Sequence, residues 1–66
     1  MEIKYPHIKL NLTGTDGNAF AVIGNVVRAL RNAGVSAEEQ TAFRKEAMSG
    51  DYDNVLVTAM RWVNIR

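Results

Sequence analysis

Residues 51–63, with the sequence DYDNVLVTAMRWV, decide the fold because they form the clearest amphipathic segment of the chain. Their apolar side chains recur at the spacing i, i+3, i+4, i+7, i+8 and i+11, which is typical of a helix with one buried face. We expect this helix to end at about Arg61 or Trp62, with Leu56 at the centre of the core. The repeating side chains carry no chemistry, so they indicate how the chain packs and leave its function open. The predicted buried face consists of Tyr52, Val55, Leu56, Ala59, Met60 and Val63.

Another helix is predicted earlier in the chain, from about Ala19 to Ala33. Because its apolar set is broad and its polar stripe is narrow, we expect this helix to be the most buried one. Gly24 in its interior costs about 0.5–1 kcal/mol relative to alanine, which indicates that another backbone passes close to it. The apolar residues are Phe20, Ile23, Val27 and Leu30 on one line, with Val22, Val26 and Ala29 beside them.

Glycines and N-cap residues separate the predicted helices. Gly34 is expected to end the helix over 19–33 as its C′ residue. Ser36 follows as an N-cap, and Glu39 three residues later completes a capping box. The same signals recur at Gly50, which stops the middle helix, and at Asp51, which caps the last one.

The middle helix, over about residues 37–48, is only weakly amphipathic. We expect it to cover its neighbours, because it has few apolar side chains to bury. Those side chains are Phe43, Ala47 and Met48.

Strands are predicted at both ends of the chain. Residues 7–13, HIKLNLT, alternate strictly between apolar and polar side chains, which is typical of a strand with one buried face. Pro6 has no N–H and suits the start or the edge of such a strand. The last residues, WVNIR over 62–66, have enough β character for a short strand beside the first. The predicted fold class is therefore α+β, in the order β-α-α-α-β.

Composition is that of a single small domain over residues 1–66. Eight basic and seven acidic residues give a net charge of +1, which argues against strong sequence-independent attraction to nucleic acid or membranes. The chain has no cysteine, so it cannot form disulfides or thiolate zinc sites. No stretch approaches the roughly 18 apolar residues of a membrane span. The N-terminus lacks the pattern of a signal peptide, and we expect a cytoplasmic protein.

A chain of this size buries only about 60% of the surface that it exposes when unfolded, so its stability is marginal. Association is a simple way to bury more surface, and two-fold dimers are the commonest soluble oligomers. A single amphipathic strand with a short mate also leaves an edge that another strand could pair with. We therefore expect a homodimer, formed by pairing of residues 8–13 across a two-fold axis.

Three stretches, IKLNLTGTDGNAFAVIG, VVRALRNAGVSAEE and EAMSGDYDNVLVTAMRWVNI, together resemble a family of small uncharacterised bacterial and phage proteins. The resemblance covers roughly residues 8–65, and its most specific parts are the DGNAFA and SGDYDN blocks. No activity is established for that family, so the resemblance carries over no functional residue. It implies an accessory protein of bacterial or phage origin.

The stretch from residue 25 to residue 47 has the turn of a DNA-binding helix-turn-helix but not its flanks. Leu30 stands where that motif usually has a small residue, and Gln40 stands where it has an apolar one. Glu38 and Glu39 would face phosphates at the start of a recognition helix. An ordinary packing unit is therefore favoured, and nucleic-acid binding is kept as an alternative. Its candidate residues are Arg28, Arg31 and Arg44.

Other candidate sites have simpler interpretations. Residues 51–54 and 16–18 offer oxygen ligands but lack the ligand count of a calcium site, and helix capping explains them. His7 has no second histidine or cysteine with which to form a zinc site or a catalytic pair. The loop over 14–17 lacks the pattern of a phosphate-binding loop. Trp62 is expected to have a structural role.

The sequence thus predicts no catalytic residue, no metal site and no cofactor, because no base, nucleophile and orienting group occur together. The favoured hypothesis is a non-enzymatic protein-binding or assembly module that forms a homodimer and has a further protein partner. The alternative is a nucleic-acid-binding accessory protein. The identity of the partner, the host and the biological role do not follow from the residues.

Overall fold

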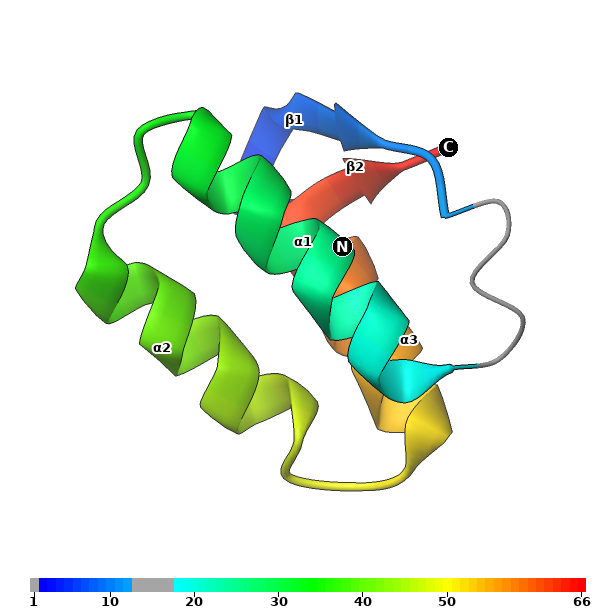
Figure 1. Ribbon diagram of the computed structural model, residues 1–66. Coiled ribbons are helices and arrows are strands. Elements are labelled where there is room, and N and C mark those ends of the chain that lie inside the picture. Colours follow the sequence, from blue (N-terminus) through cyan, green and yellow to red (C-terminus); the bar gives the residue numbers. More distant parts are fainter. Residues whose placement is uncertain (1, 13–17) are drawn as a thin grey trace.

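The computed structural model describes residues 2–12 and 18–66, and its elements follow in the predicted order β-α-α-α-β (Figure 1). The α+β fold class is therefore confirmed. The elements are β1 (Tyr5–Leu10), α1 (Ala19–Asn32), α2 (Ala37–Ala47), α3 (Tyr52–Trp62) and β2 (Val63–Ile65). The first strand begins two residues earlier than its alternating pattern indicates and includes Pro6. The predictions for Thr13 and for the loop over 14–17 concern residues outside the described ranges.

The two strands pair in parallel, so the chain must cross from one end of the sheet to the other between them. The three helices make that crossing. Tyr5 pairs with Val63 and Leu10 pairs with Ile65, and the register shifts between Tyr5 and Lys9. The backbone N–H of Lys4 donates to the carbonyl oxygen of Arg61 at 2.8 Å, which extends the pairing beyond the strand. Figure 1 shows β1 and β2 side by side.

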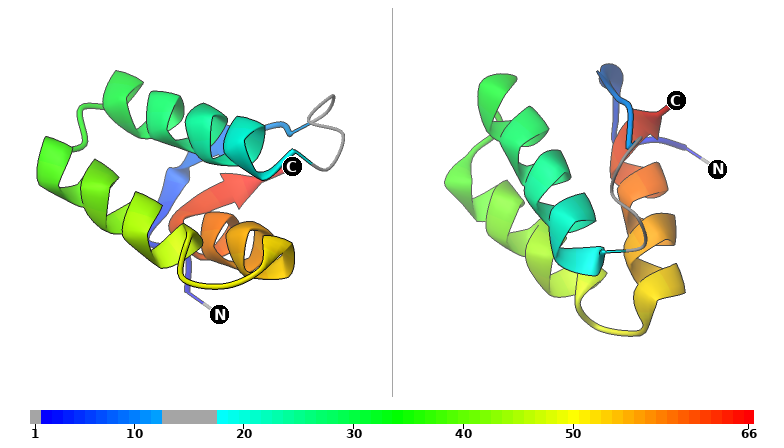
Figure 2. Two further views of the ribbon diagram at one scale, coloured as in Figure 1. Left: turned by 60° about the horizontal axis from the view of Figure 1, so that its bottom comes forward. Right: turned by 45° about the vertical axis from the view of Figure 1, so that its right-hand side comes forward.

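The helices form two layers around one core. Figure 2 shows α1 and α2 together on one side, and α3 with the two strands on the other. The core lies between them, and Phe43, Leu30, Val22 and Val26 are its largest fully buried apolar side chains apart from Val63. The remaining buried apolar residues are Ile8, Ile23, Val27, Ala47, Val55, Ala59 and Trp62.

The junction between α1 and α2 is built as the sequence predicts. Gly34 has a φ of 85°, which an L side chain rarely adopts, and it follows the C-cap residue Ala33. The Val35 N–H donates to the carbonyl of Leu30 at 3.0 Å, and the Gly34 N–H donates to that of Arg31 at 3.0 Å. These two bonds are the Schellman motif, which satisfies the last carbonyls of the helix. Gly34 is thus confirmed as the C′ residue.

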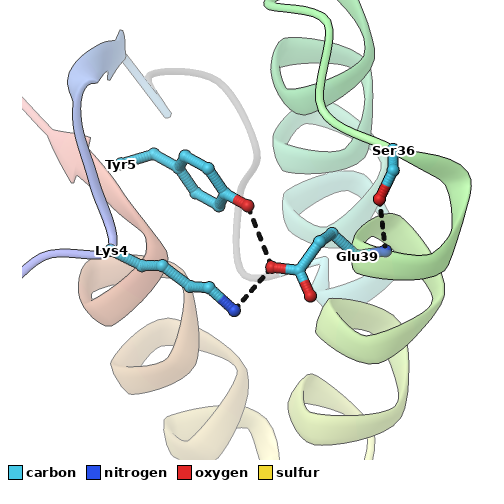
Figure 3. A network of polar contacts seen from close by, with 4 residues as sticks. All are labelled: Lys4, Tyr5, Ser36 and Glu39. Carbon is cyan, nitrogen blue, oxygen red and sulfur yellow. Dashed lines mark hydrogen bonds and ion pairs between the residues drawn. The ribbon is translucent and has the colours of Figure 1, made fainter.

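Only half of the predicted capping box forms at the start of α2. The Ser36 hydroxyl accepts from the Glu39 N–H at 3.3 Å, as expected of an N-cap. The Glu39 carboxylate does not complete the box, because it is directed to Lys4 and Tyr5 of the N-terminal segment (Figure 3). The sequence pattern therefore gives the correct helix start and a wrong partner for the acid.

The buried face of α3 is rotated from the predicted one. Met60 is 48% exposed and Leu56 is only half-buried, so Leu56 is not a central core residue. Trp62 accounts for the rotation, because its ring packs at an edge against that of Phe43 with 5.5 Å between centroids. The residues that the helix buries are Val55, Thr58, Ala59 and Trp62.

Three further expectations about burial are wrong. Phe20 is 75% exposed because it lies on the solvent-facing side of α1, in line with exposed Gly24 and Arg28. Met48 is 58% exposed because α2 ends at Ala47 and Met48 is its C-cap residue. No backbone of the described residues passes close to Gly24, since a Cβ placed there would meet nothing within 4 Å.

The Asn54 side chain bridges the junction between α2 and α3. The Asn54 side-chain amide donates to the carbonyls of Glu46 at 2.9 Å and Ala47 at 3.2 Å, and so caps α2 from the first turn of α3. Asp51 accepts from the Asn54 N–H at 3.0 Å, which confirms it as the N-cap of α3. Gly50 leaves room for this arrangement, because a Cβ there would lie 3.0 Å from the Asn54 Cβ. The SGDYDN block thus forms this junction.

Candidate functional site

A shallow apolar groove lies where the start of α1 meets the junction between α2 and α3. Its volume is about 220 Å³. Ile23 and Val55 are buried in the core below it, while Phe20 and Met48 are two of the most exposed large apolar side chains among the described residues. The lining residues are Ala19, Phe20, Ile23, Met48, Gly50, Asp51, Tyr52 and Val55. We call this set the α1 groove.

The groove has one charged member, Asp51, and its exposed carboxylate caps α3. The start of α1 is also capped, because the Asn18 side-chain oxygen accepts from the N–H groups of Phe20 at 3.0 Å and Ala21 at 3.2 Å. The helix ends at the groove therefore have caps within the chain. Apart from Tyr52 and Asp51, the side chains that line the groove are apolar, and such a surface can bind another apolar surface.

The three candidate arginines are all exposed. Arg28 and Arg31 lie one turn apart on α1, and Arg44 lies on α2. Within the described residues, none of the three makes a hydrogen bond or an ion pair. Their positions late in their helices suit the negative end of the helix dipole, which explains cations there without a partner. They stay available to an acidic or anionic surface.

A second cluster joins Lys4, Tyr5, Glu39 and Trp62 and ties the N-terminal segment to α2 and α3. Figure 3 shows Lys4 and Tyr5 directed to Glu39 of α2. The Lys4 ammonium pairs with the Glu39 carboxylate, and the Tyr5 hydroxyl donates to the same carboxylate at 2.9 Å. The Lys4 ammonium also lies 4.2 Å from the centroid of the Trp62 ring, a cation–π contact. The Tyr5 ring lies 6.0 Å from that of Trp62. Each polar group has a partner within the chain, so the cluster is a structural clasp.

The contacts of this cluster shift the pKa values of its members. Hydrogen bonds from Lys4 and then Tyr5 lower the pKa of Glu39 below its ordinary value. The hydrogen bond to Glu39 raises the pKa of Lys4, while burial and then the bond to Glu39 raise the pKa of Tyr5. These shifts keep all three groups in their ordinary ionisation states near neutral pH, which is the opposite of what a general acid or base needs. No local pattern in the sequence predicts the cluster, since Tyr5 and Glu39 are 34 residues apart and Trp62 lies near the end of the chain.

Metal-binding and catalytic constellations can be searched for only in the described ranges, 2–12 and 18–66. There, no three histidine, cysteine or acidic side chains gather as they would around a metal ion. His7 is exposed, and its ring lies edge-on to that of Tyr5 with 6.2 Å between centroids. Trp62 belongs to the core and the clasp. Even the longest described helix, α1, falls short of the length and apolar character needed to cross a membrane.

Comparison with protein-family models, with curated proteins and with solved structures found no match to this chain. The resemblance to a family of small bacterial and phage proteins therefore stays a prediction. The case for a function rests on the chain's own surface.

Proposed function

We propose that this protein is a small, non-enzymatic protein-binding or assembly module that acts in the cytoplasm of a bacterium or in phage-infected cells. The α1 groove carries the proposal, because it joins Phe20 at 75% exposure and Met48 at 58% exposure over a core-lined floor. A 66-residue chain has little apolar side-chain area to spare from its own core. Large apolar side chains left outside it, clustered at a hollow, are the usual mark of a protein interface.

The homodimer belongs to the same proposal. The outer edge of β1 is a poor template for strand pairing, because Pro6 removes one N–H and the register shift interrupts the strand. Exposed Lys9 adds a charge to the strand. These features favour association through the helical surface over association through the sheet.

The test uses immobilised protein and a lysate of the source organism, with and without nuclease. We expect wild type to retain proteins after nuclease treatment and the Phe20→Ser/Met48→Ser double variant to lose them. Val57→Ser is the matched control, because Val57 is 40% exposed on α3 and lies outside the groove. Material that nuclease removes, and that the double variant still retains, would overturn the proposal.

A nucleic-acid-binding accessory protein is the second candidate, favoured by the three exposed arginines, which have no partner among residues 2–12 and 18–66. With a net charge of +1, duplex DNA should bind no more tightly than the sequence-independent range of about 10⁻⁴ to 10⁻⁶ M at physiological salt. Fluorescence anisotropy on mixed-sequence and genomic fragments measures this affinity. Tighter binding to particular fragments, weakened by Arg28→Ala, Arg31→Ala or Arg44→Ala, would promote this candidate over protein binding.

A further inference from the structure

We propose that the occupant of the α1 groove is a second copy of this chain, with the two α1 helices antiparallel and crossing at Gly24 on a two-fold axis. This inference rests on the proposed assembly function and names its interface. Three observations on α1 carry it: an exposed glycine, an exposed aromatic ring and an exposed cation without a partner in the described part of the chain.

Gly24 is the first observation. It lies inside α1 and faces solvent, and a Cβ there would meet nothing within 4 Å. A helix-interior glycine is less favourable than alanine, and here no turn, positive φ or close neighbour among the described residues requires it. A small residue at this position would be needed if another helix packed closely against α1, because a small side chain lets the two backbones come together. Since none of the described helices approaches Gly24, the helix that this proposal places there belongs to a second copy of the chain.

The neighbours of Gly24 on the same ridge are the second and third observations. Phe20 and Arg28 are four residues before and after it, so the three side-chain positions form one exposed line along α1. An antiparallel crossing with its axis at Gly24 places Phe20 beside the partner's Arg28, and the reverse contact follows by symmetry. A guanidinium over an aromatic ring is a favourable pair, and the arginine stem adds apolar contact.

The antiparallel arrangement also brings opposite charges together at the groove. It lays the basic half of the partner's α1, which carries Arg28 and Arg31, over the end of α1 where Phe20 and Asp51 line the groove. It also sets the negative end of the partner's helix dipole against the positive end of α1. A parallel pair of helices would instead bring like charges together. Charge and shape thus select the antiparallel, two-fold dimer.

The contact area between the two α1 helices indicates how tightly the dimer should bind. A helix of 14 residues is about 21 Å long, and one helix pair covers less than the roughly 800 Å² per partner of stable complexes. We therefore expect a weak dimer that forms in the micromolar range or above.

The main experiment places one cysteine in a chain that has none, so any disulfide reports a single contact. On a two-fold axis residue 24 lies next to its own copy, and Gly24→Cys should oxidise to a disulfide-linked dimer. Thr41→Cys, on the exposed side of α2, is the control. We expect the Gly24→Cys protein to cross-link faster by about tenfold or more, because the dimer holds its thiols together. Equal rates for the two variants would overturn the interface.

Sedimentation over roughly 10 µM to 1 mM gives an independent readout of the dimer's Kd. Arg28→Glu/Arg31→Glu should weaken association by about tenfold or more, whereas Lys9→Glu/Lys45→Glu, with the same charge change elsewhere, should not. Gly24→Leu should also abolish it, while Ala42→Leu on exposed α2 leaves it intact. Circular dichroism establishes that each variant folds.

If the Gly24→Leu and Arg28→Glu/Arg31→Glu variants dimerise as tightly as wild type, the chain self-associates through another surface. That result would overturn this interface and leave the proposed function in place. A monomer at every concentration would overturn the interface as well. The lysate experiment then decides the proposed function separately, because it measures capture of other proteins.

Discussion

Trp62 organises three parts of the fold from the last position of α3. Its ring packs on Phe43 of α2, lies beside Tyr5 of β1 and receives the Lys4 ammonium on its face. An aromatic ring buries more surface than any aliphatic side chain, so it dominates how an amphipathic helix turns toward the core. This explains why Trp62 is buried and Met60 is not, although both suit a helical apolar stripe.

Core substitutions should separate the true core from the predicted one. Phe43 is fully buried, and we expect Phe43→Ala to cost about 3–5 kcal/mol of unfolding free energy. Leu56→Ala should cost only about 1–2 kcal/mol, because a half-buried leucine withdraws less apolar surface from water. Urea denaturation measures both values. A larger loss for Leu56→Ala than for Phe43→Ala would show that the observed face of α3 is wrong.

The clasp predicts how stability changes with pH. The folded pKa of Glu39 is lowered, so its contribution is present above the ordinary carboxyl pKa of 4.5 and is lost as pH falls through the folded value. The folded pKa values of Lys4 and Tyr5 are raised, so their contributions are present below about 10 and are lost as pH rises through the folded values. Stability should therefore be flat near neutrality and fall at both extremes.

Glu39→Gln isolates the acid side of that profile. The variant should melt at a temperature that depends less on pH between about 3 and 6, because its amide has no proton to take up in this range. Glu38→Gln is the matched control, since Glu38 is the neighbouring exposed acid and shows no contact of this kind. If both variants kept the wild-type pH dependence, the clasp would not contribute to acid stability.

At the scale of elements, local signals in the sequence predict helix ends better than helix faces. Gly34, Ser36 and Asp51 act where the sequence places them, because a cap depends on residues within one turn. The buried faces depend on which neighbour an element meets, and neither the parallel sense of the strands nor the Glu39 clasp has a local signal. The groove has no local signal for the same reason, since helical periodicity alone places both Phe20 and Met48 in the core.

The junction formed by Asn54 provides an element-scale test. Asn54→Ala removes the donor that caps α2 and should cost about 1 kcal/mol, with faster amide exchange at the end of α2. Asn32→Ala, at the end of α1, is the control, because Asn32 is exposed and shows no such bond. Equal effects of the two substitutions would mean that the Asn54 side chain does not hold the junction.

At the scale of the whole molecule, the structure is a small α+β domain whose two most exposed large apolar side chains, Phe20 and Met48, meet at the start of α1. The fold follows from its own core and caps, and Gly24, Phe20 and Arg28 have no evident role in it. Residues that a fold does not need are candidates for binding, and the three lie on one ridge beside the α1 groove.

The most direct measurement of this claim is a concentration series of amide NMR spectra from roughly 20 µM to 1 mM. We expect resonances of Phe20, Gly24, Arg28, Met48 and Tyr52 to shift together with concentration, while those of the outer edge of β1 stay constant. Spectra that do not change with concentration, or that change at β1 and not along α1, would contradict the α1 groove as the surface of association.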